Sequence, residues 1–217
     1  MLHKEPTEKV IPIFDYDYHM VRFVPWRDWD GVTDASYHLP AFYELWALWA
    51  NSDNEYWAET ARLSRRFFHA TAHPETGLMP DYSYYKETDR DIGDHHDDFR
   101  FDAWRVMSNV ALDHVWWGED SEWQVMQSNR ILSFLGQFEP NIPNQFTVDG
   151  QPLDQGSSPG LYAMAATAAL AADREIGQPF VQRLWDMEVP EGRWRYYDGI
   201  ISMLGLLQVS GHFQIID

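Results

Sequence analysis

The stretch LPAFYELWALW, residues Leu39–Trp49, decides the fold class. Its large apolar side chains recur three and four residues apart, which is the spacing of one helix face; they are Leu39, Phe42, Tyr43, Trp46 and Trp49. Leu45 and Leu48 extend the apolar surface around the helix, so we expect it to be buried on more than one side. The segment therefore predicts a core helix.

The residues just before this helix are typical of a helix start. Asp34 or Ser36 can accept hydrogen bonds from the first backbone N–H groups, and Pro40 fits only a first-turn position. Tyr37 and His38 would then point from the mouth of the helix rather than lie in its packed middle. A capped start with a buried Tyr37 is the alternative that the pattern leaves open.

Helical periodicity continues along the chain and predicts an all-α fold. Six further helices are expected, over Trp57–Phe68, Phe101–Trp117, Glu122–Phe138, Leu161–Ala172, Gln178–Met187 and Trp194–Val209. Strand signals are confined to Met20–Val24 and Phe146–Val148, so we expect short hairpins in loops at most. No Gly/Ser-rich linker divides the chain, and residues 1–217 are predicted to form a single domain.

Composition restricts the partners. The 217 residues carry 16 Lys and Arg against 34 Asp and Glu, a net charge of −18 that repels nucleic acid and anionic membranes. No apolar stretch approaches the ~20 residues of a membrane span, and the N-terminus lacks a signal-peptide pattern. We expect a cytoplasmic protein. Aromatic residues make up 16% of the chain, which suits either a ring-rich core or stacking on sugars.

The segment FRFDAWRV, Phe99–Val106, is the strongest candidate for chemistry. Asp102 lies near the start of an apolar helix between two aromatic residues, and Arg105 follows three residues later on the same helix face. The helix N-terminus and the guanidinium both favour an ionised carboxylate, the form that a general base needs. A capping or ion-paired structural Asp102 is the alternative from spacing alone.

The loop TDRDIGDHHDD, Thr88–Asp98, is dense in carboxylate and imidazole groups: Asp89, Asp91, Asp94, His95, His96, Asp97 and Asp98. Such groups can bind Ca²⁺ or Zn²⁺, but their spacing matches neither an EF-hand nor an H-E-x-x-H helix. A solvated acidic loop is the favoured interpretation. The chain has no Gly-rich phosphate loop and no G-x-S-x-G motif, so we predict no metal and no cofactor.

Four ordered segments together resemble glycoside hydrolase family 8, most closely its reducing-end xylose-releasing exo-oligoxylanases. They are DASYHLPAFYELWALWAN, HPETGL with DYSYY, FRFDAWRV, and RYYDGIISMLGLLQVSGHF. The resemblance implies about seven helices of a twelve-helix (α/α)6 barrel and inverting hydrolysis of β-1,4-xylosidic bonds, with xylose released from the reducing end. It implies that Asp102 is the general base and that Tyr37 borders the cleavage site. Arg105, Trp104 and Tyr197 are the further candidates for binding a xylo-oligosaccharide.

Two departures from the family pattern limit this prediction. The Glu-containing segment that carries the family's general acid has no counterpart among these residues, so we expect the C-terminal portion of a catalytic domain. Such a chain would be inactive alone and would associate with an N-terminal half, or with itself, through exposed apolar faces. Gln155–Met164 looks shorter than the loop of exo-acting members and lacks a His, which leaves exo or endo action open. A non-catalytic sugar-binding protein, a glucan or chitosan hydrolase, and a helical interaction protein remain alternatives.

Overall fold

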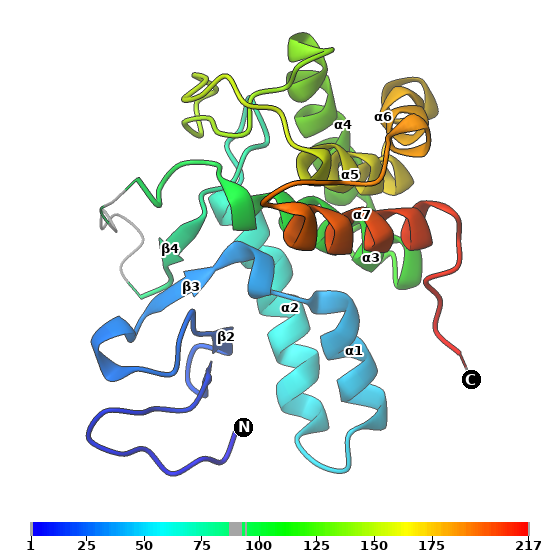
Figure 1. Ribbon diagram of the computed structural model, residues 1–217. Helices are drawn as coiled ribbons and strands as arrows, with labels where there is room; N and C mark the ends of the chain where they lie inside the picture. The colour runs from blue at the N-terminus through cyan, green and yellow to red at the C-terminus, as the bar shows by residue number, and fades with distance from the viewer. Residues whose placement is uncertain (1, 87–92, 94, 217) are drawn as a thin grey trace.

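The computed structural model describes residues 2–86, 93 and 95–216, and it is mainly helical (Figure 1). The helices in this part are α1 Pro40–Trp49, α2 Asn54–Thr71, α3 Arg105–Trp116, α4 Ser121–Leu135, α5 Pro159–Ala168, α6 Arg174–Asp186 and α7 Arg195–Val209. All seven predicted helices are present. None of the described helices has both the length and the apolarity to cross a bilayer.

Helix ends differ from the prediction mainly where 3₁₀ turns flank the α-helices. These turns are η1 Arg27–Trp29, η2 Ala35–Tyr37, η3 Phe101–Trp104, η4 Gly136–Phe138 and η5 Ala169–Ala171. Three of them, η3, η4 and η5, continue α3, α4 and α5 beyond their ends. Helix α6 begins at Arg174 rather than Gln178 and holds Pro179 in its interior, although proline is usually confined to the first turn.

Helix α5 is the centre of the packing and contacts α3, α6 and α7 (Figure 1). Every residue from Gly160 to Ala168 is buried. Small side chains allow this close approach: a Cβ atom built on Gly160 would lie 2.5 Å from Cδ1 of Ile201 in α7. The alanine-rich sequence therefore fixes how near α7 lies to the core, and α7 carries part of the candidate site.

Two small antiparallel sheets complete the fold. Strands β1 Phe14–Asp15 and β2 Met20–Val21 form a local hairpin, as predicted for this region. Strands β3 Val32–Asp34 and β4 Tyr82–Tyr84 pair across the α1–α2 hairpin, so the prediction that strands occur only in loop hairpins was wrong here. Phe146–Val148 forms no strand, and Phe146 makes only isolated bridges to Phe99 and Pro152.

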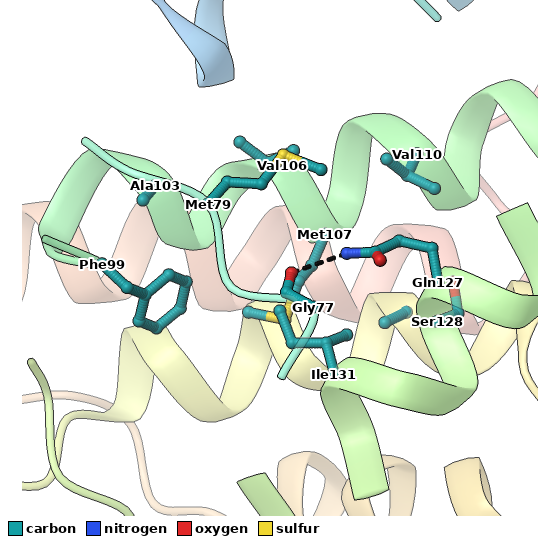
Figure 2. A pocket seen from close by; sticks show the side chains of 11 residues that line it. Gly77, Met79, Phe99, Ala103, Val106, Met107, Val110, Gln127, Ser128 and Ile131 are labelled. Atoms are coloured by element: carbon teal, nitrogen blue, oxygen red, sulfur yellow. Dashed lines mark hydrogen bonds between the residues drawn. The ribbon is translucent and has the colours of Figure 1, made fainter. Parts of the chain in front are cut away.

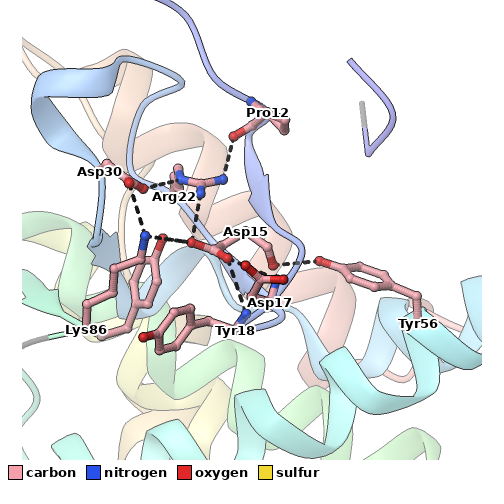
Figure 3. Close-up of polar contacts among 9 residues, drawn as sticks. Pro12, Asp15, Asp17, Tyr18, Arg22, Asp30, Tyr56 and Lys86 are labelled. Carbon is pink, nitrogen blue, oxygen red and sulfur yellow. Dashed lines mark hydrogen bonds and ion pairs between the residues drawn. The ribbon is translucent and has the colours of Figure 1, made fainter. Parts of the chain in front are cut away.

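A partly buried ion cluster ties the N-terminal segment to the rest of the molecule (Figure 3). Arg22 contacts Asp15 at 2.7 Å and Asp30 at 2.8 Å, and Lys86 Nζ lies 3.0 Å from each of the same two carboxylates. Burial alone would raise the pKa of Asp15, but Lys86 and Arg22 outweigh it and hold that pKa below its ordinary value. The hydroxyl of Tyr56 in α2 donates to the carbonyl oxygen of Asp15 at 3.1 Å.

A small enclosed cavity lies in the core between the chain at Gly77–Met79 and helices α3 and α4 (Figure 2). Its lining is almost entirely apolar, and Nε2 of Gln127 donates to the carbonyl oxygen of Gly77 at its edge, at 2.6 Å. No charged side chain lines it. The cavity is therefore a packing defect of the core and not a candidate for chemistry.

Candidate active site

Asp102 lies in the η3 turn that leads into α3. Its side chain is 28% exposed, and its Oδ1 lies 2.9 Å from Nη2 of Arg105. The ion pair predicted from the i, i+3 spacing is therefore present. Asp102 does not cap either helix, because the N-cap positions of η3 and α3 are Arg100 and Trp104 and neither makes a side-chain cap bond. The sequence left two structural alternatives for Asp102, a helix cap and an ion pair, and only the ion pair is found.

Asp34 approaches the same guanidinium from the other side. It is completely buried at the end of β3, where its Oδ1 accepts a hydrogen bond from the backbone N–H of Ser36 at 2.7 Å. It thus caps η2, whereas the N-cap of α1 is Leu39, so the predicted capping of α1 was wrong. Its Oδ2 lies 3.6 Å from Nη2 of Arg105. Burial raises the pKa of Asp34 to about 7, with the charge of Asp102 adding to the effect.

Tyr37 is half-buried beside these charges. Its ring centroid lies 5.9 Å from the guanidinium carbon of Arg105, and its ring stacks on Phe23 at a centroid distance of 5.9 Å. Burial, together with the charges of Asp34 and Asp102, raises the pKa of the Tyr37 phenol. The Tyr37 hydroxyl is therefore neutral at ordinary pH, on a ring that lies beside the guanidinium paired with Asp102.

His38 is not at the mouth of the helix, contrary to the prediction. It is fully buried between Thr33 and Ser64, with its Nε2 2.8 Å from one hydroxyl and its Nδ1 3.0 Å from the other. Burial lowers the pKa of His38 to about 3. Because the break between η2 and α1 turns the chain at this point, Tyr37 lies near the site while His38 enters the core.

An open pocket begins at Asp102 and is formed by η3, by the loop before α5 and by the start of α7. The hydroxyl of Tyr197 donates to the carbonyl oxygen of Phe101 at 3.0 Å. Trp104 is only 2% exposed and donates from Nε1 to the carbonyl oxygen of Asn144 at 3.1 Å, so it forms a wall of the pocket rather than an exposed stacking surface. Sequence reasoning missed several lining residues: Asn144, Ser157, Ser158, Pro159, Trp194 and Asp198.

Asp81 is a further group that the sequence pattern did not single out. It is buried, and its Oδ2 lies 2.9 Å from Nδ1 of His96, whose ring stacks on Tyr82. The β3–β4 pairing sets Asp34 opposite Tyr82 and so brings this segment to the site. Burial raises the pKa of Asp81, with the charge of Asp102 adding to it and His96 opposing it. Local periodicity carries no signal for such a non-local pairing.

The acidic loop contributes little that can be described. Asp89 and Asp91 lie outside the described residues, as does Asp94. His96 is engaged with Asp81, and Nδ1 of His95 lies 3.8 Å from Asp98. Within the described part of the chain, no three His, Asp or Glu side chains converge as a metal site would require.

The site thus combines a partly exposed, ion-paired carboxylate, a neutral phenol and a pocket walled by aromatic rings. Carboxylates supply proton transfer and hydroxyl-group recognition, and rings stack on the apolar faces of sugars. On a helical scaffold this combination is typical of carbohydrate-binding sites. The chain belongs to glycoside hydrolase family 8, because residues 26–211 match the model of that family, glycosyl hydrolases family 8.

The relatives agree with this assignment. The chain is 37% identical, over 99% of its length, to the reducing-end xylose-releasing exo-oligoxylanase Rex8A of Paenibacillus barcinonensis, and 38% identical over 94% to a protein of the same description from Halalkalibacterium halodurans. It also superimposes on a family 8 xylobiose complex from Teredinibacter turnerae with a TM-score of 0.90, at 38% identity over 94% of the chain.

The chain spans about half the length of these relatives. It covers 57% of the Paenibacillus protein, 52% of the Halalkalibacterium protein and 53% of the Teredinibacter chain. The mainly helical fold agrees with the expectation from the family, while its assignment as seven helices of a partial (α/α)6 barrel stays a prediction. The roles of Asp102, Tyr37, Arg105, Trp104 and Tyr197 likewise stay predictions.

Proposed function

We propose that this chain supplies the general base of an inverting β-1,4-xylosidase that releases xylose from the reducing end of xylo-oligosaccharides. The observation that carries the proposal is the ion pair between Asp102 and Arg105 at the mouth of an aromatic pocket. The printed descriptions of the relatives supply the substrate class. In this assignment residues 1–217 are the C-terminal portion of a catalytic domain.

The chemistry follows from the geometry of Asp102. Its carboxylate is exposed enough to reach a water molecule, and Arg105 fixes its orientation through one oxygen, leaving the other free to accept a proton. Loss of a proton to Asp102 gives the water hydroxide character, and its oxygen attacks the anomeric carbon. We assign the alignment of that water to the Tyr37 phenol, whose ring centroid lies 5.9 Å from the guanidinium carbon of Arg105. Tyr197 and the pocket beyond Asp102 would hold the sugar.

Inverting hydrolysis needs a second carboxyl group, which protonates the leaving oxygen about 6.5–9.5 Å from the base. We propose that this general acid lies outside these residues, in a partner segment that completes the domain. Exposed apolar side chains along α7 offer a surface for it: Tyr196, Ile200, Met203, Leu206 and Leu207. The greater length of the relatives supports such a partner over self-association of this chain.

Three measurements test the assignment together. The purified chain is mixed with the N-terminal half of the Paenibacillus relative, and xylose release from xylotriose is measured. We expect activity only in the mixture. ¹H NMR should show the α-anomer first at the newly formed reducing end, because inversion of a β-linkage yields α. The substitution Asp102→Asn should lower kcat by about 10²–10⁴-fold, the usual contribution of a general base.

Asp28→Asn is the matched control, because Asp28 is an exposed carboxylate in η1 that takes no part in the pocket. It should leave xylose release unchanged. Activity of Asp102→Asn within tenfold of the parent would remove Asp102 from the base role. Xylotriose binding by calorimetry without turnover in the mixture would favour a non-catalytic sugar-binding protein, and preferred cleavage of cello- or chito-oligomers would favour the alternative substrates.

A further inference from the structure

The guanidinium of Arg105 lies close to two carboxylates, those of Asp102 and Asp34. Nη2 of Arg105 lies 2.9 Å from Oδ1 of Asp102 and 3.6 Å from Oδ2 of Asp34, and it donates to the hydroxyl of Ser36 at 2.8 Å. With both carboxylates ionised, this group carries one net negative charge. The position of the guanidinium between them therefore depends on the charge of Asp34, and Asp34 takes no part in the proposed reaction.

The surroundings of Asp34 leave a charge on its carboxylate with few groups to compensate it. It is completely buried, its Oδ1 is used by Ser36, and its Oδ2 has no hydrogen-bond partner. The titratable and charged groups whose fields reach it come from η2, β4, η3, α3 and α7; they are Tyr37, Tyr82, Asp102, Arg105 and Tyr197. Arg105 is the one cation among these five, so it alone can compensate a charge on Asp34.

We propose that Asp34 is a positioning residue for the general base: when Asp34 holds a proton, Arg105 pairs with Asp102 alone, and when Asp34 is ionised, Arg105 is shared between the two carboxylates. This inference rests on the base role proposed for Asp102. Attraction to an ionised, buried carboxylate is strong enough to move a guanidinium by the roughly 0.8 Å that separates 3.6 Å from a direct contact of about 2.8 Å.

This change in the partners of Arg105 falls near neutral pH, since burial raises the pKa of Asp34 to about 7. As the pH rises through this value, Arg105 is drawn towards Asp34 and its hold on Asp102 loosens. In the complemented enzyme kcat should therefore fall above neutral pH, while KM changes less because the pocket walls stay in place. Asp34→Asn cannot ionise, so its kcat should lack this alkaline decline even if its absolute value is lower.

A readout independent of activity is the side-chain ¹⁵N signal of Arg105 in the chain itself, assigned by its loss in Arg105→Lys. We expect this signal to shift with pH in a single transition near 7 in the parent protein and to show no such transition in Asp34→Asn. Asp81→Asn is the control, because Asp81 is a second buried carboxylate whose pKa is affected by the charge of Asp102, and it should keep the transition. Loss of the transition in Asp81→Asn but not in Asp34→Asn would overturn the proposal.

A second measurement needs no Asp34 variant, in case that protein fails to fold. With ¹³Cγ-labelled aspartate in the parent chain, one carboxyl signal should titrate near pH 7 in step with the Arg105 signal. An Arg105 signal that is flat between pH 5 and 9 would overturn the inference, whatever the catalytic result. Conversely, a coupled titration in the chain, combined with no xylotriose hydrolysis in the complemented mixture, would leave the positioning contact intact and count only against the proposed function.

Discussion

The hydroxyl of Tyr197 donates a hydrogen bond to the backbone carbonyl of Phe101 at 3.0 Å. This contact joins the first turn of α7 to the η3 turn, one residue before Asp102. The ring of Tyr197 also lies 6.2 Å from that of Trp104, the last residue of the same turn. The C-terminal helix thus holds the turn that carries the proposed base, although nearly a hundred residues separate the two segments.

Tyr197→Phe should show what this hydrogen bond contributes. The ring packing is retained, but the carbonyl of Phe101 loses its donor, so urea unfolding should show a loss of about 1 kcal/mol. We also expect kcat of the complemented enzyme to fall several-fold, because the η3 turn is less tightly fixed. Tyr196→Phe is the matched control, since Tyr196 is 78% exposed, and it should change neither quantity. Equal effects from both variants would contradict the contact's role.

His38 should make the stability of the fold depend on pH. Burial lowers its pKa to about 3 from the ordinary 6.5, so the unfolded chain gains a proton on acidification before the folded chain does. The free energy of unfolding should therefore decrease as the pH falls from about 6.5 to 3, by about 1.4 kcal/mol per pH unit from this group alone. Urea unfolding at successive pH values measures the slope.

His38→Gln should reduce this slope while keeping partners for Thr33 and Ser64. His212→Gln provides the comparison, because His212 is an exposed residue near the C-terminus. It should leave the pH dependence unchanged. If His38→Gln retains the parent's slope between pH 6.5 and 4, the buried imidazole is not the group responsible.

The ion cluster around Asp15 should govern the attachment of the N-terminal segment. Arg22→Met removes a buried guanidinium that contacts Asp15 and Asp30, leaving Lys86 as their cation. Breaking a buried pair in this way costs about 3–5 kcal/mol, and thermal unfolding should show it. Because the pKa of Asp15 is lowered, the stability it contributes is present above its ordinary value of 3.8 and is lost as the pH falls through the folded-state pKa.

Arg22→Met should therefore be less sensitive to acid below pH 4 than the parent, since the interaction that acid removes is already weakened. Arg62→Met serves as the control, because Arg62 pairs with Glu59 on the exposed surface of α2. It should cost far less than Arg22→Met, because an exposed ion pair is screened by solvent. A similar loss in the two variants would mean that the cluster in Figure 3 contributes no more than a surface ion pair.

Helix positions and the Asp102–Arg105 pair could be predicted from the sequence because both depend on residues a few positions apart. The apolar spacing at Leu39–Trp49 and the i, i+3 spacing within FRFDAWRV are local signals. Pro40 likewise marked the first turn of α1. The break between η2 and α1 was missed because Asp34 can cap either a 3₁₀ turn or an α-helix, and the residue pattern does not distinguish them.

The remaining parts of the site depend on contacts between distant segments. The β3–β4 pairing that brings Asp34 and Asp81 near Asp102 crosses two helices, and three-residue strands leave almost no period-two signal. The burial of Trp104 and His38 likewise depends on what packs over them, which periodicity cannot specify. The family resemblance named Asp102 and Tyr37, but neither it nor the residue pattern indicated that Asp34 shares the guanidinium of Arg105.

The approach of α5 to α7 provides a steric test of how the site is supported. Gly160→Ala would place a Cβ atom 2.5 Å from Cδ1 of Ile201 and 2.6 Å from Oδ1 of Asp198, so both side chains must move. Oδ1 of Asp198 accepts from the Ser158 hydroxyl at 2.7 Å, and that bond would be disturbed. We expect a loss of about 1–3 kcal/mol in urea unfolding and weaker xylotriose binding, because Ser158 and Asp198 both line the pocket.

Gly199→Ala is the matched control, because a Cβ atom at Gly199, which lies in α7, would meet no atom within 4 Å. Replacing glycine by alanine inside a helix without a clash should stabilise the protein by roughly 0.5–1 kcal/mol. The two substitutions therefore have opposite expected signs although they add the same methyl group. Stabilisation by both would mean that α7 can move away from α5 at no cost, and the pocket walls would then not be fixed by the close packing at Gly160.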